Sequence, residues 1–195
     1  DVPLWIDTSD PAVLEIALKN VKGRVGINST TGEEKRMDAV IPLAAQYDAA
    51  LVGLCIDDAG IPATSEKRVE IAKRIIDRAE KEGMDRKNMI IDCVALACGT
   101  ASTGAKATLD TIRIVTEELG VNTTVGLSNV SFGLPDRGMI NAAFVTLAIA
   151  AGMTATISNP EHMKQPILAT DLLLGRDEWA MRYISYFRSK PKPSE

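Results

Sequence analysis

The sequence is poor in the residues that build disulfide frameworks and zinc sites. Its 195 residues include three cysteines, Cys55, Cys93 and Cys98, and a single histidine, His162. An odd number of cysteines without a Cys-x-x-Cys spacing argues against disulfide bonds and structural zinc. We therefore expect free thiols, a cytoplasmic location and no bound metal.

A basic surface and long hydrophobic runs are also missing. The formal net charge is −4, which gives the chain no excess of positive charge to neutralise nucleic-acid phosphates. No apolar run approaches the roughly 18 residues of a membrane span. The remaining composition, 46% hydrophobic and 25% charged residues, is typical of one globular domain. These features argue against a nucleic-acid or membrane partner.

Short apolar runs alternate with segments of helical periodicity. The runs are rich in Val, Ile and Leu without polar alternation, as in parallel strands buried on both faces. Predicted strands cover residues 3–7, 24–28, 50–56, 89–95, 123–129 and 154–159. Predicted helices cover residues 10–20, 33–47, 66–82, 105–119, 138–151, 161–174 and 178–188.

This alternation is typical of an open doubly wound sheet or a closed barrel. Each unit takes about 32 residues, so eight would need about 260, the usual size of a (β/α)8 barrel. No glycine-rich dinucleotide fingerprint follows a strand. We predict the last six units of a TIM barrel in residues 1–189, with the first two units missing, followed by a tail or linker at 190–195. The absence of an initial Met also indicates a fragment.

Polar residues stand at the carboxyl ends of the predicted strands, where barrel enzymes have their active sites. They are Asp7, Asn28, Asp57, Asp58, Asp92, Asn129, Ser158 and Asn159. Because no lysine stands at a strand end, Schiff-base chemistry is disfavoured. Oxygen ligands of this kind suit Mg²⁺, or a flat heterocycle with several N–H donors such as a pterin. Any one of these residues is as easily a helix N-cap, and Asp57 or Asp58 a turn residue.

Residues 126–137, with the sequence GLSNVSFGLPDR, resemble the signature of the methyltetrahydrofolate:corrinoid methyltransferase family. That family includes the folate domain of cobalamin-dependent methionine synthase and the methyltransferase of the corrinoid/iron–sulfur protein. The segments at 6–9 (IDTS), 27–30 (INST), 91–92 (ID), 148–153 (AIAAGM) and 157–160 (ISNP) agree in order and spacing. The resemblance covers essentially the whole chain and implies a pterin-binding barrel.

The resemblance also implies roles for individual residues. Asp7, Asn28 and Asp92 match positions that hydrogen-bond the pterin ring. Gly126 and Ser128 are expected to lie on the same strand as each other and to line the pterin slot. Asn129 matches the asparagine that approaches N5, and Arg137 matches an arginine near the site. We expect Asn129 to be the catalytic residue, which positions N5 and stabilises its charge while water or a carboxylate delivers the proton.

The implied reaction moves the N5 methyl group of methyltetrahydrofolate to the cobalt of cob(I)alamin. The corrinoid is then carried by a partner domain or protein, and a homodimer is expected from the resemblance alone. Dihydropteroate synthase is a weaker match, because its lysine and Arg-x-His are replaced here by Ser128-Asn129 and Ser158-Asn159. A folate-binding module without turnover and a Mg²⁺-dependent barrel enzyme remain open. Cys93 follows Asp92 where the family often has proline, which leaves the subfamily open.

Overall fold

The computed structural model describes residues 2–189, so the predicted tail at 190–195 lies outside the described residues. Five strands form one parallel sheet. They are β1 (Leu4–Asp7), β2 (Val25–Thr31), β3 (Ala50–Leu54), β4 (Met89–Asp92) and β5 (Asn122–Thr124). The α-helices are α1 (Pro11–Asn20), α2 (Glu34–Gln46), α3 (Ser65–Lys81), α4 (Gly104–Ile114), α5 (Arg137–Ala150), α6 (Pro160–Leu173) and α7 (Met181–Ser189).

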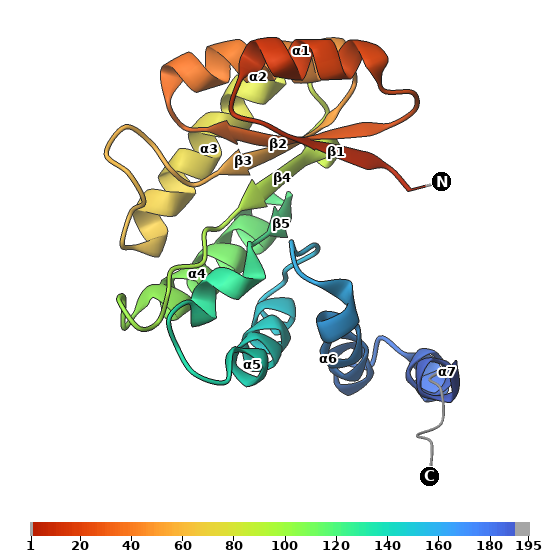
Figure 1. The fold of residues 1–195 in the computed structure, drawn as a ribbon. Coiled ribbons are helices and arrows are strands. Elements are labelled where there is room, and N and C mark those ends of the chain that lie inside the picture. Colours follow the sequence, from red (N-terminus) through yellow and green to blue (C-terminus); the bar gives the residue numbers. More distant parts are fainter. Residues whose placement is uncertain (1, 190–195) are drawn as a thin grey trace.

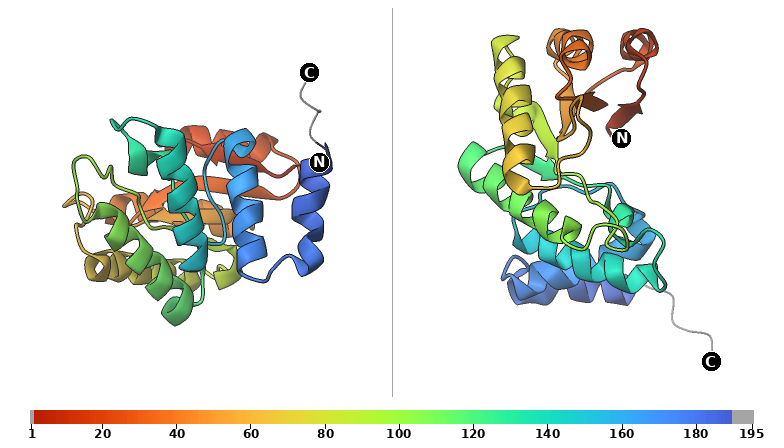
Figure 2. Two further views of the ribbon diagram at one scale, coloured as in Figure 1. Left: turned by 90° about the horizontal axis from the view of Figure 1, so that it is seen from below. Right: turned by 90° about the vertical axis from the view of Figure 1, so that its left-hand side faces the viewer.

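The strands lie side by side in chain order, and the helices follow one another along the outside of the sheet (Figure 1). A doubly wound sheet would instead reverse its strand order at a switch point. Helices α5, α6 and α7 continue the outer layer side by side (Figure 2). The predicted α/β barrel architecture is therefore confirmed, as an arc with β1 at one edge.

The predicted sixth strand, 154–159, is wrong. The described chain has only one parallel bridge there, between Gly126 and Ile157. The hydroxyl of Thr154 donates to Thr123 O and accepts from Thr123 N, while the Thr156 hydroxyl donates to Val125 O. Backbone bonds also join the segment to β5 and the residues after it, from Ala155 N to Thr123 O, Ile157 N to Val125 O and Leu127 N to Ile157 O, but they make only this one bridge and no regular strand.

The fifth strand is also shorter than the predicted 123–129. It ends at Thr124, and a 3-10 helix, η3 (Leu127–Ser131), follows it. The predicted helix at 105–119 likewise changes type, because α4 continues as a π-helical turn, η2 (Val115–Leu119). The last predicted helix begins with a 3-10 turn, η4 (Glu178–Ala180), before α7.

Several helices begin where the sequence predicts them. The Asp10 carboxylate accepts a hydrogen bond from Ala12 N at 2.8 Å at the start of α1. The Asn159 side chain caps α6 in the same way, accepting from Glu161 N at 2.9 Å. Both residues precede a proline, whose fixed φ suits the first helical position. Asn159 is therefore a helix cap, one of the two roles left open for strand-end residues.

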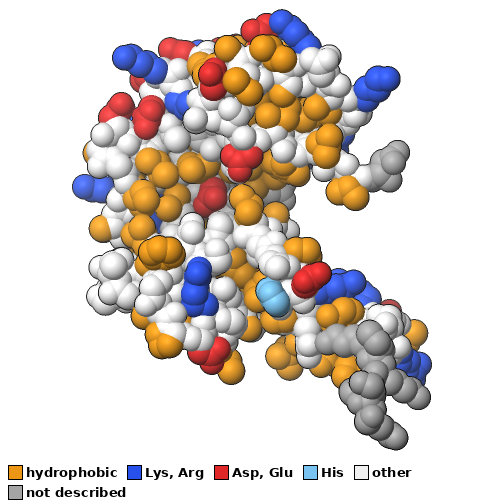
Figure 3. Space-filling model, viewed as in Figure 1, with side chains coloured by type: hydrophobic (Ala, Val, Ile, Leu, Met, Phe, Trp, Pro, Cys, Tyr) orange, Lys and Arg blue, Asp and Glu red, His pale blue; other side chains and the backbone are white. Residues whose placement is uncertain are grey.

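The two faces of the sheet have different surroundings. The outward side chains Ile27, Leu51 and Ile91 are fully buried, and they belong to one hydrophobic core with side chains from the helices. On the inner face, the Trp5 ring lies over Gly26, where an added Cβ would come within 2.3 Å of the ring. The space-filling view shows a hollow open to one side, with hydrophobic side chains at its rims (Figure 3). The inner face of the arc is thus accessible.

Other predictions concern the cysteines and the membrane. Cys55 and Cys93 are buried, Cys98 is half-buried, and all three thiols are free. None of the helices in the described range 2–189 has the length and hydrophobicity needed to cross a membrane.

The contact between β3 and α3 offers a test of the fold. A Cβ added at Gly53 would lie 2.8 Å from Cγ2 of the fully buried Ile75, whereas one at Gly138 would meet nothing within 4 Å. Gly53→Ala is expected to lower the free energy of unfolding by about 1–3 kcal/mol through overpacking. Gly138→Ala, the control, is expected to leave it unchanged or raise it by up to about 1 kcal/mol. Urea denaturation measures both; equal effects would contradict the packing of α3 on the sheet.

Candidate active site

Three of the predicted site residues lie on the inner face of the sheet. Asp7 pairs with Asn28 in register, Asn28 with Val52, and Val52 with Ile90. Because alternate residues of a strand share a face, Asp92 lies on the same face as Ile90. A pocket of about 220 Å³ on this face is lined by Trp5, Asn28, Val52, Ile90, Thr124, Ala155, Thr156 and Ile157. The sheet thus brings Asp7, Asn28 and Asp92 to one side at its carboxyl end.

Asp7 and Asn28 are in direct contact. The Asn28 Nδ2 donates to Asp7 Oδ2 at 3.1 Å. Arg36, from α2, holds the chain beyond both residues: its Nη2 donates to Thr8 O at 2.9 Å and to Ser29 O at 2.8 Å, and its Nη1 donates to Ser9 O. The guanidinium therefore ties the ends of β1 and β2 together.

Asp92 is the buried member of the set. Its Oδ1 accepts a hydrogen bond from Val94 N at 2.8 Å, and its side chain has little exposure to solvent. Burial raises the pKa of the Asp92 carboxyl to about 6, against the opposing effects of the Val94 N–H and the charge of Arg68. Asp92 is thus the carboxylate whose ionisation depends most on its surroundings.

Asn129 lies on the 3-10 helix η3 instead of the predicted strand. Its side chain is exposed and folds back over Gly126, where an added Cβ would lie 3.0 Å from Asn129 Nδ2. The missing side chain at Gly126 therefore makes room for the Asn129 carboxamide.

Ser128 and Arg137 form a separate contact. The Arg137 Nη2 donates to Ser128 O at 2.8 Å, and its Nε donates to Ser131 Oγ at 3.1 Å. The guanidinium also lies over the Phe132 ring, 5.8 Å from its centroid. Arg137 holds both ends of η3, so its observed contacts are with the turn that carries Asn129.

The predicted residues therefore form four groups instead of one bonded network. Asp7 with Asn28 and Gly126 with Asn129 are in contact, Arg137 binds Ser128 O, and Asp92 bonds to its own loop. Ser128 and Arg137 line a second pocket of about 470 Å³, together with Leu127, Gly138, Asn141, Ser158, Asn159, His162 and Met163.

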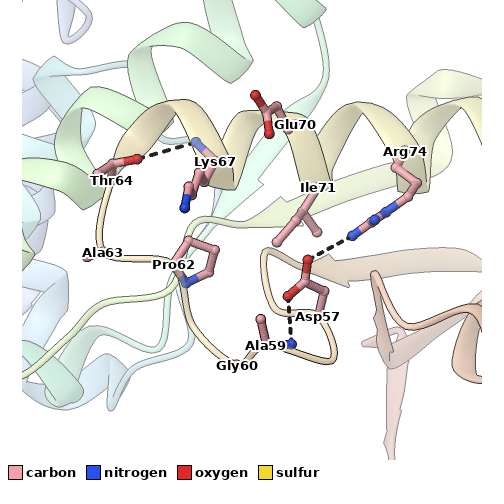
Figure 4. Close-up of a pocket in the computed structure, with 10 residues that line it drawn as sticks. All are labelled: Asp57, Ala59, Gly60, Pro62, Ala63, Thr64, Lys67, Glu70, Ile71 and Arg74. Carbon is pink, nitrogen blue, oxygen red and sulfur yellow. Dashed lines mark hydrogen bonds and ion pairs between the residues drawn. The ribbon is translucent and has the colours of Figure 1, made fainter.

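A third pocket, of about 450 Å³, lies between α3 and the loop after β3 (Figure 4). There the Asp57 Oδ1 accepts from Ala59 N at 3.0 Å, and Oδ2 pairs with Arg74 at 3.1 Å. Asp57 therefore has the turn role expected for it or Asp58. Within residues 2–189, no group of three or more His, Cys, Asp or Glu side chains is placed to hold a metal ion.

The prediction missed Arg36 and Arg68. Arg68 is fully buried, and its Nη1 donates to Cys93 O at 3.0 Å and to Val94 O at 2.9 Å. A signal was present, because Arg68 falls on the buried stripe of α3 that continues through Ala72, Ile75 and Ala79. An arginine on such a stripe needs buried acceptors, and strand-end carbonyls are the acceptors nearby.

Comparisons with known proteins agree on one family. The family model described as pterin binding enzyme matches residues 1–159. A methylcorrinoid:tetrahydrofolate methyltransferase of Eubacterium limosum is 36% identical over 195 residues, covering 96% of this chain and 71% of that protein. A methionine synthase of Mycobacterium leprae (strain TN) is 34% identical, and the match covers 90% of this chain but only 16% of that protein.

Among solved structures, the dihydropteroate synthase of Yersinia pestis superposes with a TM-score of 0.68. The match covers 90% of this chain and 73% of that chain at 12% sequence identity. At that identity the likeness shows the barrel fold alone.

The raised pKa of Asp92 leads to a prediction about stability. Because the folded-state pKa, about 6, exceeds the ordinary 3.8, protonated Asp92 favours folding at low pH, and this contribution is lost as pH rises through 6. Asp92→Asn keeps an acceptor for Val94 N–H without the buried charge. The variant is expected to be more stable than wild type above pH 7 by up to about 3 kcal/mol, and equally stable below pH 4. Urea denaturation at both pH values measures this, and a difference independent of pH would contradict it.

Proposed function

The chain belongs to the pterin-binding enzyme family, and from this premise we propose that it transfers a methyl group between N5 of tetrahydrofolate and the cobalt of a corrinoid. The observation that carries the proposal is the placement of Asp7, Asn28 and Asp92 on one accessible inner face. The name of the Eubacterium relative describes transfer from a methylated corrinoid to tetrahydrofolate. The sequence-based prediction runs from methyltetrahydrofolate to cob(I)alamin; one site serves both directions by microscopic reversibility.

In this proposal the three polar residues bind the pterin edge. A pterin offers an amino group and ring N–H groups as hydrogen-bond donors. An ionised carboxylate accepts hydrogen bonds from these groups, and a carboxamide can both accept and donate. Asp92 is suited to the charged contact because its Oδ1 is already fixed by Val94 N, which leaves Oδ2 for the ligand. Asn28 donates to Asp7, so the two present one joined surface.

Asn129 is the proposed catalytic residue at N5. Loss of the methyl group to cob(I)alamin leaves an amine anion unless N5 is protonated or hydrogen-bonded. A carboxamide does not titrate, so Asn129 positions N5 and stabilises its developing charge while water or a carboxylate supplies the proton. Gly126 and Ser128 line the slot beside it, and Arg137 keeps η3 in place.

The corrinoid is a substrate presented by a partner domain or protein. The reacting cobalt must approach N5 closely, so the carboxyl end of the sheet has to stay open to a bulky ring. Asn129 is exposed there, as this approach requires. The proposal also includes a cytoplasmic homodimer; the exposed Met139 and Leu147 on α5 are available for such contacts.

Asn129→Ala separates catalysis from binding. We expect the methyl-transfer rate to fall by about 100-fold, as on loss of one donor to a developing charge, while the Kd for methyltetrahydrofolate changes less than about fivefold. Single-turnover spectroscopy of cob(I)alamin gives the rate and calorimetry gives the Kd. Asn122→Ala, at the opposite end of β5, is the control and should change neither. Equal losses of rate and affinity in Asn129→Ala would count against a role at N5.

The affinity for folate should also depend on pH. Since the contact needs an ionised Asp92 with a pKa of about 6, the association constant is expected to fall about tenfold per pH unit below 6. Calorimetric titration with methyltetrahydrofolate between pH 5 and 8 measures the profile. Asp92→Asn should bind weakly with no such dependence. A flat wild-type profile would show that Asp92 does not bind the ligand as a carboxylate.

A further inference from the structure

Arg68 lies fully buried behind the end of β4, on the first turn of α3. Its Nη1 donates to the carbonyls of Cys93 and Val94 and to Thr108 Oγ1, at 3.0, 2.9 and 3.1 Å. Its Nε donates to Pro62 O at 2.8 Å. One guanidinium therefore joins the loop after β3, the loop after β4 and α4.

These bonds meet at a backbone conformation that needs support. Val94 has φ +55°, in the left-handed region that a β-branched residue rarely adopts. Its N–H donates to Asp92 Oδ1, and its carbonyl accepts from Arg68 Nη1 and from Thr108 Oγ1 at 2.9 Å. Both backbone polar groups of Val94 are thus bonded: its N–H to Asp92, the residue proposed to bind the pterin, and its carbonyl to Arg68.

Arg68 also supplies the favourable charge near Asp92. The two thiols near Asp92, Cys55 just after β3 and Cys93 just after β4, have pKa values raised by burial and stay neutral. The partners of Asp92 in the adjacent strands, Leu54 and Thr124, carry no charge. The positive charge of Arg68, from α3, lowers the pKa of Asp92 against the effect of burial.

We propose that Arg68 is a positioning residue for the pterin: through Val94 it fixes the direction of the Asp92 carboxylate, and it places a positive charge near that carboxylate. This inference rests on the proposed function, in which Asp92 binds the pterin. Arg68 itself is enclosed behind the strand end and touches no ligand in this account. Lysine is no substitute, because a single ammonium cannot occupy the positions of both Nε, which donates to Pro62 O, and Nη1, which donates to the carbonyls of Cys93 and Val94.

Three variants of the full-length protein test the inference. Arg68→Met removes the charge and the donors, and Arg68→Lys removes the fork but keeps the charge. Arg78→Met is the matched control, since Arg78 lies near the other end of α3 and pairs with Asp38 and Glu82. Each protein is titrated with methyltetrahydrofolate by calorimetry between pH 5 and 8.5, and its melting temperature is recorded at each pH.

At pH 8, where Asp92 is ionised in wild type, Arg68→Met is expected to bind folate about tenfold more weakly, because the carboxylate loses its fixed direction. The pH below which binding weakens should also rise, because the favourable charge is gone. Arg68→Lys should weaken binding at pH 8 but keep the wild-type pH midpoint. Arg78→Met should match wild type in both.

A merely structural arginine would lower the melting temperature of Arg68→Met without moving the pH midpoint, and that result overturns the inference. If Arg68→Met does not fold, Arg68→Lys decides, because wild-type affinity in that variant would show that the fork is not needed. If wild-type protein binds folate and Arg68→Met binds it with the same affinity and pH dependence, only the inference about Arg68 is refuted. Wild-type protein that binds no folate refutes the proposed function, and the inference with it.

Discussion

The geometry of the site depends on how backbone carbonyls are satisfied beyond the last ladder bond of each strand. Buried carbonyl groups need donors, and the chain beyond a strand end has left its partner. Here arginines from the outer helices supply them: Arg36 binds the carbonyls of Thr8, just after β1, and of Ser29, near the end of β2, while Arg68 binds those after β4 and Arg137 binds that of Ser128. Each contact lies within two residues of a proposed pterin-binding side chain. The packing of the helices is thereby linked directly to the direction in which Asp7, Asn28, Asp92 and Asn129 point.

This arrangement suits the recognition of a neutral, flat ligand by fixed polar groups. The carboxylates differ in environment: Asp7 is exposed and bonded to Asn28, whereas burial raises the pKa of Asp92 to about 6. Ionisation of Asp92 therefore carries the cost of desolvation, which a ligand with N–H donors reduces by bonding to the charge. Asn129 stands apart on η3 and is exposed, as the proposed approach of a cobalt centre from outside requires.

Much of the fold was predictable because parallel strands and amphipathic helices leave strong local patterns. The helix start at Asp10-Pro11 and the buried stripe of α3 illustrate this. The segment 154–159 has strand-like composition and backbone bonds to Thr123 and Val125, yet it makes a single bridge, and the hydroxyls of Thr154 and Thr156 also bond to the neighbouring backbone. The position of Asn129 also escaped prediction. Its side chain occupies the space that a side chain at Gly126 would fill, and this contact does not follow from the local preference of either residue. The role of Arg68 depends on carbonyls 25 and 26 residues away in the chain, which no local pattern encodes.

Asp92 and its neighbours on the inner face are proposed to form a pterin site that works without a metal ion. The most direct measurement is calorimetric titration with methyltetrahydrofolate in the presence and absence of EDTA. Wild-type protein, Asp92→Ala and the control Asp38→Ala, whose carboxylate pairs with Arg78 on the outer helices, would be compared. We expect that EDTA does not alter binding, that Asp38→Ala retains it and that Asp92→Ala loses it. Binding that disappears with EDTA, or that survives in Asp92→Ala, would contradict it.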